Sequence, residues 1–165
     1  LAQRLATRHL AMHLLSDSIR KQILGIPVDE RRFDGYGKGI YTSDISKRTY
    51  EELLNRAEIF LKGRQSVILD ATFLAPETRN HCRELAQRLG VKLLFVWAKC
   101  PENTIARRMQ RRAKEGGFSD ANLEVYRAMK ARFQPPEPRA DLITVDTRVP
   151  IVKLFKKIER ALLCV

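Results

Sequence analysis

One stretch near the middle of the chain, Ser66 to Phe73 (SVILDATF), limits the possible folds more than any other. Its apolar residues Val67 to Leu69 are consecutive rather than alternating, and they lead directly into Asp70. A continuous apolar run is typical of a parallel strand that is buried on both faces. Because an unpaired buried carboxylate is energetically costly, Asp70 is expected at the carboxyl end of that strand, where the crevice of an open α/β sheet lies.

Two interpretations of Asp70 follow from this position. It can face a magnesium ion, or the water shell of the ion, as the acidic residue of a nucleotide-binding fold does. Alternatively, it is a strand-end aspartate that caps the turn into the next helix. The spacing by itself does not separate the two.

The rest of the chain alternates between strand-like and helix-like segments. Further strands are predicted at residues 9–16, 91–98 and 142–146, and helices at residues 1–8, 18–24, 43–62, 76–89, 101–115, 119–134 and 151–162. This alternation predicts one α/β domain, residues 1–165, in which a parallel sheet with right-handed crossovers carries helices on both faces.

A long loop is predicted at residues 26–41, where one proline and three glycines interrupt the pattern. Its segment Gly35–Gly39 (GYGKG) does not have the GxxxxGK[ST] spacing of a phosphate-binding loop, and no predicted strand precedes it. A flexible or substrate-facing loop is therefore the better interpretation.

The composition restricts the partners and the compartment. The chain carries 31 Lys and Arg against 19 Asp and Glu, a net charge of +12. This excess favours an anionic partner, which can be a nucleotide, a phosphorylated substrate or nucleic acid, although solvated basic surfaces also contribute to it. The three cysteines show neither metal-ligand nor disulfide spacing, which indicates a reducing cytoplasm. No apolar run approaches the roughly 20 residues of a membrane span.

A second candidate site follows the first predicted strand. Asp17 lies directly after that strand, and Arg20 lies one helical turn further on. An aspartate in this position can accept the proton of an attacking hydroxyl. The arginine can hold an anionic group of the same acceptor by a forked contact. The alternative is that Asp17 or Ser16 caps the following helix.

A third candidate site is the arginine-rich segment Ala106–Ala113. Arg108 and Arg112 are four residues apart and therefore share one face of a helix. Arg107 and Arg111 share a neighbouring face. Two arginines on one face can stabilise the charge that spreads over the oxygens of a phosphoryl group during its transfer. A solvated basic face and a polynucleotide-binding face are the alternatives.

Together, three segments resemble the P-loop kinases of the zeta-toxin and polynucleotide-kinase-like group: LLSDSIRKQI, VILDATFLAPETR and CPENTIARRMQRRAKEGGFSDA. The resemblance covers roughly residues 10–147. It implies a three-layer P-loop kinase fold with a five-stranded parallel sheet, four of whose strands are visible here. It also implies ATP and Mg²⁺ as cofactors, and a lid at residues 101–118 that closes over the triphosphate.

The resemblance further implies roles on the acceptor side of the site. Asp17 matches the general base for the acceptor hydroxyl, and Arg20 matches the arginine that holds the substrate. Thr72 matches a threonine that contacts the acceptor.

On the nucleotide side, Asp70 matches the Walker-B-type acid, which supports magnesium through water. Arg108 and Arg112 match the catalytic lid arginines. The strand that ends at Asp146–Thr147 matches the segment leading to the adenine pocket, without residue-level roles.

One large departure from these kinases is that the Walker A loop and the strand before it are absent from the sequence. In relatives, a helix much like Leu1–Ala6 directly follows that loop. We therefore expect an apolar strand and a GxxxxGK[ST] loop immediately before Leu1 in the natural protein. The strand is expected in the middle of the sheet, between the strands that lead to Asp17 and Asp70 or beside one of them. Without this segment the chain is expected to be inactive.

The predicted function is ATP-dependent transfer of the γ-phosphate to a hydroxyl group of a small molecule. A 5′-hydroxyl polynucleotide kinase is the first alternative, which the charge favours. However, polynucleotide kinases of this group often have an acid just before the threonine, where this chain has Ala71. The second alternative is a nucleotide-binding or nucleic-acid-binding module without catalysis.

Overall fold

The computed structural model of the chain describes residues 1–30, 32, 34–35, 37–115 and 123–165, with the side chains of residues 112–115 and 123 left out. The strands are β1 (Met12–Leu15), β2 (Val67–Asp70), β3 (Phe95–Lys99) and β4 (Leu142–Asp146). The helices are α1 (Ala2–His9), α2 (Ser16–Ile23), α3 (Ser43–Lys62), α4 (Pro76–Leu89), α5 (Glu102–Glu115), α6 (Leu123–Arg132) and α7 (Ile151–Leu163), with a short 3₁₀ helix η1 (Gly39–Tyr41).

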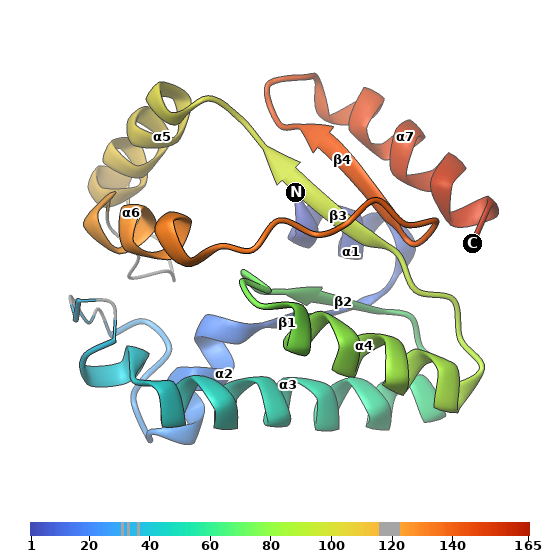
Figure 1. Cartoon of the computed structure of the whole chain (residues 1–165), viewed down its shortest axis with the longest axis horizontal. Coiled ribbons are helices and arrows are strands. Elements are labelled where there is room, and N and C mark those ends of the chain that lie inside the picture. Colours follow the sequence, from blue (N-terminus) through green and yellow to red (C-terminus); the bar gives the residue numbers. More distant parts are fainter. Residues whose placement is uncertain (31, 33, 36, 116–122) are drawn as a thin grey trace.

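The four strands form two separate parallel sheets, β1–β2 and β3–β4 (Figure 1). In the first sheet Leu15 lies opposite Asp70, and in the second Lys99 lies opposite Asp146. Because paired parallel strands end together, each sheet gathers its carboxyl ends at one edge. Helices α2 and α5 leave from these ends on the same side of the molecule (Figure 1). The predicted parallel α/β architecture is confirmed.

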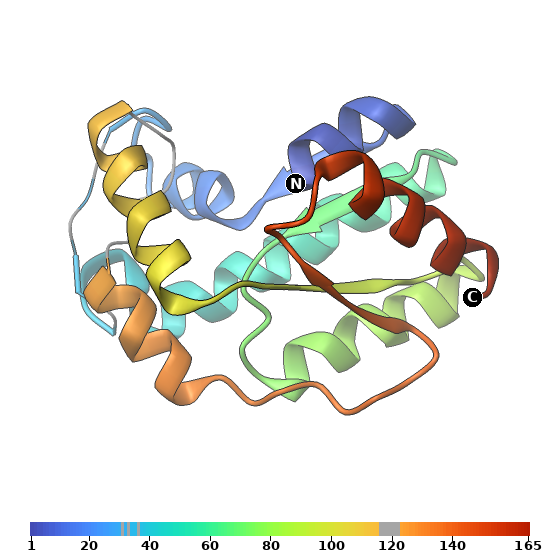
Figure 2. The ribbon, with the colours of Figure 1, turned by 90° about the horizontal axis from the view of Figure 1, so that it is seen from above.

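Helices cover both faces of the strands, as the two hydrophobic clusters show. Val67 and Leu69 of β2 pack into a cluster centred on Leu14, Ile19 and Leu53, on the side of α3. The intervening Ile68 packs into the other cluster, with Leu5 of α1 and core residues of β4 and α7. Successive strand residues point to opposite faces, so α1 and α3 lie on opposite sides of the first sheet. Figure 2 shows α1 and α7 together on one side of the strands.

Local sequence signals account for most helix ends. Pro76 begins α4, where its missing N–H costs nothing. Gly90 ends that helix in the left-handed conformation (φ 63°), and the amide of Val91 donates to the carbonyl of Ala86. At the end of α3, Gly63 has an ordinary φ, and Arg64 adopts the left-handed conformation instead (φ 58°).

Two predicted strands begin later than expected. The strand predicted at residues 9–16 begins at Met12, because α1 continues to His9 and ends at Leu10 with a φ of 49°. The strand predicted at 91–98 begins at Phe95, where the amide of Phe95 donates to the carbonyl of Asp141 and pairing with β4 starts.

One expectation about the sheet is wrong, and one of two alternatives for the missing strand is excluded. Strand β2 is half-buried at every position rather than buried on both faces, because β1 is its only partner strand in the described part of the chain. In addition, no strand can lie between the strands that lead to Asp17 and Asp70, because β1 and β2 pair directly with each other. The edges of β2 and β3 that are unpaired in the described chain, called the inner edges below, are places where a further strand can pair, as are the outer edges of β1 and β4.

Among the described residues, no helix is both long and apolar enough to cross a membrane.

The three cysteines differ in exposure, which gives a simple test of the packing. Cys82 is 4% exposed between α4 and the core, and burial raises the pKa of its thiol to about 12. Cys164 is exposed and Cys100 is partly exposed. Since only the thiolate reacts, we expect the folded protein at pH 8 to react rapidly with an aromatic disulfide at Cys164 and Cys100 only. Cys82 should react after denaturation. Equal reactivity of all three thiols in the folded protein would contradict the packing of α4.

Candidate active site

The candidate residues lie at the carboxyl ends of the strands. Asp17 is in the first turn of α2, directly after β1, and Asp70 is the last residue of β2. Thr72 follows β2 in the turn that leads to α4, and Arg108 lies in α5, the helix after β3. This is the edge at which open parallel sheets bind their ligands.

Asp17 and Arg20 form a buried ion pair. Each residue is 7% exposed, and Arg20 Nη1 donates to Asp17 Oδ1 at 2.9 Å. The cap position of α2 is Leu15, without a side-chain cap hydrogen bond, so neither Asp17 nor Ser16 caps the helix as the alternative required. A carboxylate that an arginine holds in this way is a candidate acceptor for the proton of a hydroxyl.

The loop after α2 is folded against this ion pair. The guanidinium of Arg20 lies over the ring of Tyr41, 4.9 Å from its centre, and Tyr41 is 5% exposed in η1. At the start of the loop, the ammonium of Lys21 donates to the carbonyls of Val28 and Glu30 at 3.1 and 2.7 Å. Lys21 is only 1% exposed, so its charge serves to hold the loop backbone. The loop at 26–41 thus has an ordered start and end beside Asp17.

Glycine is required at position 39 of the same loop. Its φ is 50°, and a Cβ placed there would collide with the carboxylate of Asp34. That carboxylate accepts a hydrogen bond from the amide of Ile40 at 3.0 Å. Gly39 therefore lets the loop close on Asp34. Among the described residues, the element before this segment is α2 and not a strand, as expected for a loop that is not of the GxxxxGK[ST] kind.

Asp70 contacts a residue that no sequence pattern marks as part of a site. His13 of β1 lies beside it, with Nε2 3.2 Å from Asp70 Oδ2. The aspartate side chain is still 45% exposed. In the described parts of the chain, no group of three or more His, Cys, Asp or Glu side chains is arranged to hold a metal. A single exposed carboxylate fits a magnesium ion that keeps most of its water ligands, rather than an ion enclosed by protein.

The side chain of Thr72 contacts the hydroxyl of Tyr50, a residue of α3. The two side-chain oxygens are 3.2 Å apart, and the amide of the next residue, Phe73, donates to the Tyr50 hydroxyl at 2.9 Å. Burial raises the pKa of Tyr50, while its hydrogen bonds to Thr72 and Phe73 and the nearby charge of Arg20 act in the opposite direction. Tyr50 therefore stays protonated at neutral pH and holds the turn at Thr72 and Phe73.

Phe73 adopts a conformation that is unusual for a large side chain. Its φ is 43°, in the left-handed region, which costs a residue with a Cβ about 1–2 kcal/mol. Its ring contacts those of Tyr50 and Phe95, with centroids 5.5 and 6.1 Å away. Such strain persists only where the surroundings hold it, and it is common at functional sites. Here it turns the chain directly after Thr72.

Arg108 is anchored to the other sheet. Its guanidinium donates to the hydroxyl and to the carbonyl of Thr147, both at 2.7 Å, directly after β4. Neighbouring Asp146 is bound by Arg148, which holds the pKa of the Asp146 carboxyl at about 2. The backbone of Arg112 continues α5, but its side chain lies outside the described part of the chain. The structure thus pairs Asp17 with Arg20, holds Thr72 on Tyr50, and places Arg108 in a separate group at the end of β4.

The sequence of this chain is similar to one protein-family model and to curated mycobacterial proteins. The model of the AAA domain family matches residues 1–136. The uncharacterized protein Rv2004c of Mycobacterium tuberculosis (strain H37Rv) is 29% identical over 122 residues, which are 74% of this chain and 24% of that protein. The uncharacterized protein Mb2027c of Mycobacterium bovis matches with the same values. The chain therefore spans about a quarter of the length of these curated relatives.

Solved structures of kinases have the same fold. A gluconokinase from Sinorhizobium meliloti 1021 superposes with a TM-score of 0.67 at 19% identity, covering 98% of this chain and 82% of that one. A sugar kinase from Janibacter sp. HTCC2649 superposes with a TM-score of 0.68 at 20% identity, covering 99% and 86%. At these identities the likeness establishes the P-loop kinase fold.

Proposed function

Since the chain belongs to the AAA domain family, we propose that it carries out ATP-dependent transfer of the γ-phosphate to a hydroxyl group of a small molecule. The observation that carries this proposal is the buried Asp17–Arg20 pair at the carboxyl end of β1. A buried carboxylate that is paired with an arginine, at the edge of the sheet that also carries the exposed Thr72, is suited to activate a hydroxyl. Within the family, the zeta-toxin and polynucleotide-kinase-like group is the one that the sequence resembles.

In the proposed reaction, the acceptor oxygen attacks the γ-phosphorus and the bond from that phosphorus to the bridging oxygen of ADP breaks. The proton of the hydroxyl passes to Asp17. Arg20 and Thr72 orient the acceptor. Arg20 Nε is buried without a hydrogen-bond partner among the described residues, which supports contact with an anionic group of the acceptor.

On the nucleotide side, Arg108 and Arg112 would neutralise the charge that develops on the phosphoryl oxygens. Asp70 would hold magnesium through water, and the ion would supply further charge neutralisation on the phosphates. We propose that residues 1–165 form one kinase domain and that residues 101–118 form its lid. Of this segment, residues 116–118 lie outside the described part of the chain.

We further propose that a strand and a glycine-rich loop from outside residues 1–165 complete the domain between β2 and β3. Both inner edges lack a partner strand in the described chain, and such edges are normally paired or covered. The accessible surface, 10556 Å², exceeds the roughly 8,400 Å² expected for a folded chain of 19.0 kDa. The sequence upstream of Leu1 in the intact protein tests this directly. A segment there without a glycine-rich loop and lysine would favour the non-catalytic binding module.

The proposed function is tested by incubating the intact protein with γ-labelled ATP, Mg²⁺ and a panel of hydroxyl acceptors. The panel contains anionic acceptors, such as sugar acids, and neutral acceptors, such as polyols and simple alcohols. Label transfer to one class, lost on omission of Mg²⁺, is the expected result. ATP binding without transfer to any acceptor, and without hydrolysis, would favour the binding module instead.

The polynucleotide alternative gives a separate prediction. A chain with net charge +12 will attract nucleic acid, and this attraction should weaken steeply with salt because bound counterions are released. We expect weak binding without sequence preference, and no efficient labelling of a 5′-hydroxyl oligonucleotide by the intact protein. A phosphorylated 5′ end on the same oligonucleotide is the matched control for binding. Efficient transfer to the 5′-hydroxyl end would replace the small-molecule acceptor with a polynucleotide.

A further inference from the structure

Arg79 of α4 occupies a buried position that the proposed chemistry does not use. It is 5% exposed. Its Nη1 donates to the carbonyl of Phe73 at 2.6 Å, and its Nη2 donates to the carbonyl of Gln134 at 3.0 Å. Two segments that are far apart in the sequence therefore share one guanidinium. One of them is the turn directly after Thr72, and the other is the segment directly after α6.

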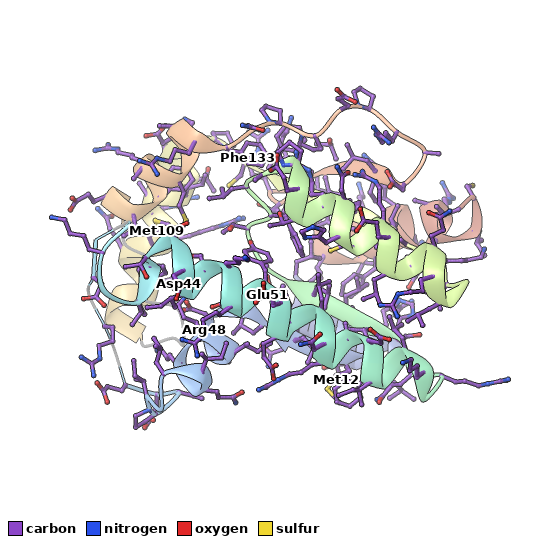
Figure 3. The ribbon with its side chains drawn as sticks, turned by 60° about the horizontal axis from the view of Figure 1, so that its bottom comes forward. Met12, Asp44, Arg48, Glu51, Met109 and Phe133 are labelled. Atoms are coloured by element: carbon purple, nitrogen blue, oxygen red, sulfur yellow. The ribbon has the colours of Figure 1, made fainter. Side chains whose placement is uncertain are left out.

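A backbone hydrogen bond makes the same connection. The amide of Gln134 donates to the carbonyl of Leu74 at 3.1 Å. The Gln134 backbone is thus bound to the turn through both its N–H and its carbonyl. Figure 3 shows the neighbouring Phe133 beside the start of α4. The strained turn at Phe73 is consequently held on one side by Tyr50 and on the other by Arg79 and Gln134.

Contacts continue from Gln134 to the helix that carries the arginines. Phe133 packs on Trp97 of β3, with ring centroids 5.3 Å apart. In α6, Lys130 forms an ion pair with Glu102 at the start of α5, at 2.7 Å. Helix α5 carries Arg108. A continuous series of contacts therefore runs from the nucleotide-side arginine to the acceptor-side threonine.

We propose that Arg79 is a positioning residue that couples the placement of Thr72 to that of α5 and α6, an inference that rests on the proposed function of both sites. In this proposal, a nucleotide bound to Arg108 reduces the mobility of the turn at residues 71–75, which contacts the acceptor. Because coupling between two binding sites is reciprocal, acceptor binding raises the affinity for nucleotide to the same extent. Arg79 needs no contact with either substrate for this role.

The first test needs no nucleotide and uses three variants of the intact protein. Arg79→Met removes the shared donor, and Arg79→Lys keeps the charge but cannot span both carbonyls. Arg88→Met is the control, because Arg88 lies on the same helix, is exposed, and pairs with Glu58 of α3. In Arg79→Met, amide exchange is expected to become about tenfold faster in residues 71–75 and at Phe133 and Gln134 together, with partial recovery in Arg79→Lys. Emission from Trp97, the only tryptophan, should change in parallel. Arg88→Met should behave as the parent protein does.

A further variant distinguishes coupling through Arg79 from a general loss of stability. Phe133→Leu weakens the contact with Trp97 on the far side of the link. In the parent background it should speed exchange in residues 71–75, and in the Arg79→Met background it should not. Equal effects in both backgrounds, or a change in only one of the two segments in Arg79→Met, would overturn the proposal.

The nucleotide arm uses a non-hydrolysable ATP analogue with Mg²⁺. It should slow exchange in residues 71–75 of the parent protein and of Arg88→Met, and leave them unchanged in Arg79→Met, although the analogue still binds within about threefold of the parent affinity. Binding without protection of residues 71–75 in the parent protein would also overturn the coupling. Failure of the analogue to bind the parent protein would count against the proposed function, and the nucleotide-free arm would then decide the role of Arg79.

Discussion

Replacing Asp17 with asparagine is expected to lower the turnover of the intact enzyme by about 10²–10⁴-fold, the usual contribution of a general base. The amide has nearly the same shape, but it cannot take the proton of the acceptor hydroxyl. Affinity for the ATP analogue should persist, because Asp17 contacts Arg20 and lies apart from Arg108. Single-turnover transfer from ATP to the acceptor identified by the panel measures the effect on the chemical step.

Loss of a buried ion pair also destabilises a protein, so the melting temperature of Asp17→Asn must be measured and the assay kept well below it. Asp44→Asn is the matched control, since Asp44 lies in the first turn of α3 and is exposed on the face seen in Figure 3. If Asp17 only placed a negative charge at the start of a helix, the two variants would have similar small effects. Unchanged turnover in a folded Asp17→Asn protein would remove Asp17 from the mechanism.

Replacing Arg108 with alanine is expected to lower turnover by about 10²–10³-fold, the typical loss when one donor to the developing charge is removed. In the structure its guanidinium is bound to Thr147, so it is held close to the end of β4 before nucleotide arrives. The expected loss appears mainly in kcat, because the interaction is strongest in the transition state. The analogue should also protect amides of residues 104–115 in the parent protein and protect them less in the variant.

Arg107→Ala is the control for Arg108→Ala. Arg107 is the preceding residue of the same helix, is exposed, and lies on a different face. Its replacement removes the same charge and should change turnover by no more than about threefold, as expected of a solvated surface residue. Equal losses in the two variants would mean that α5 contributes only its overall positive charge.

Local sequence patterns were sufficient to predict most of the fold. The apolar run before Asp70 predicts β2, the Pro76 and Gly90 signals bound α4, and the apolar stripe from Ile151 predicts α7. These signals depend on residues close together in the chain. The prediction that β2 is buried on both faces was wrong. Burial of a strand depends on which strands lie beside it, and those are distant in the sequence.

The surroundings of the candidate site could not be predicted in the same way. Tyr50 falls within the amphipathic pattern of α3, and nothing near it in the sequence indicates that its hydroxyl reaches Thr72. His13 is one residue of a strand, and its contact with Asp70 arises only from the pairing of β1 with β2. Arg79 looks like an ordinary helix arginine until the segment at Gln134 is in place. Each contact joins segments that are distant in the chain, so a periodicity analysis does not reveal it.

The division of the strands into two sheets also affects how the protein unfolds. One hydrophobic cluster lies on the α3 side of β1 and β2, and the other combines β3, β4 and α7 with Leu5 of α1 and Ile68 of β2. Because no strand of the described chain pairs with both sheets, we expect a broad thermal transition in which the β3–β4 unit and the β1–β2 unit melt at different temperatures. A strand that paired with both inner edges would merge the melting of the two units into a single transition. Asp17 belongs to one unit and Arg108 to the other, so the same strand would fix the distance between the proposed proton acceptor and the proposed phosphate-binding arginine.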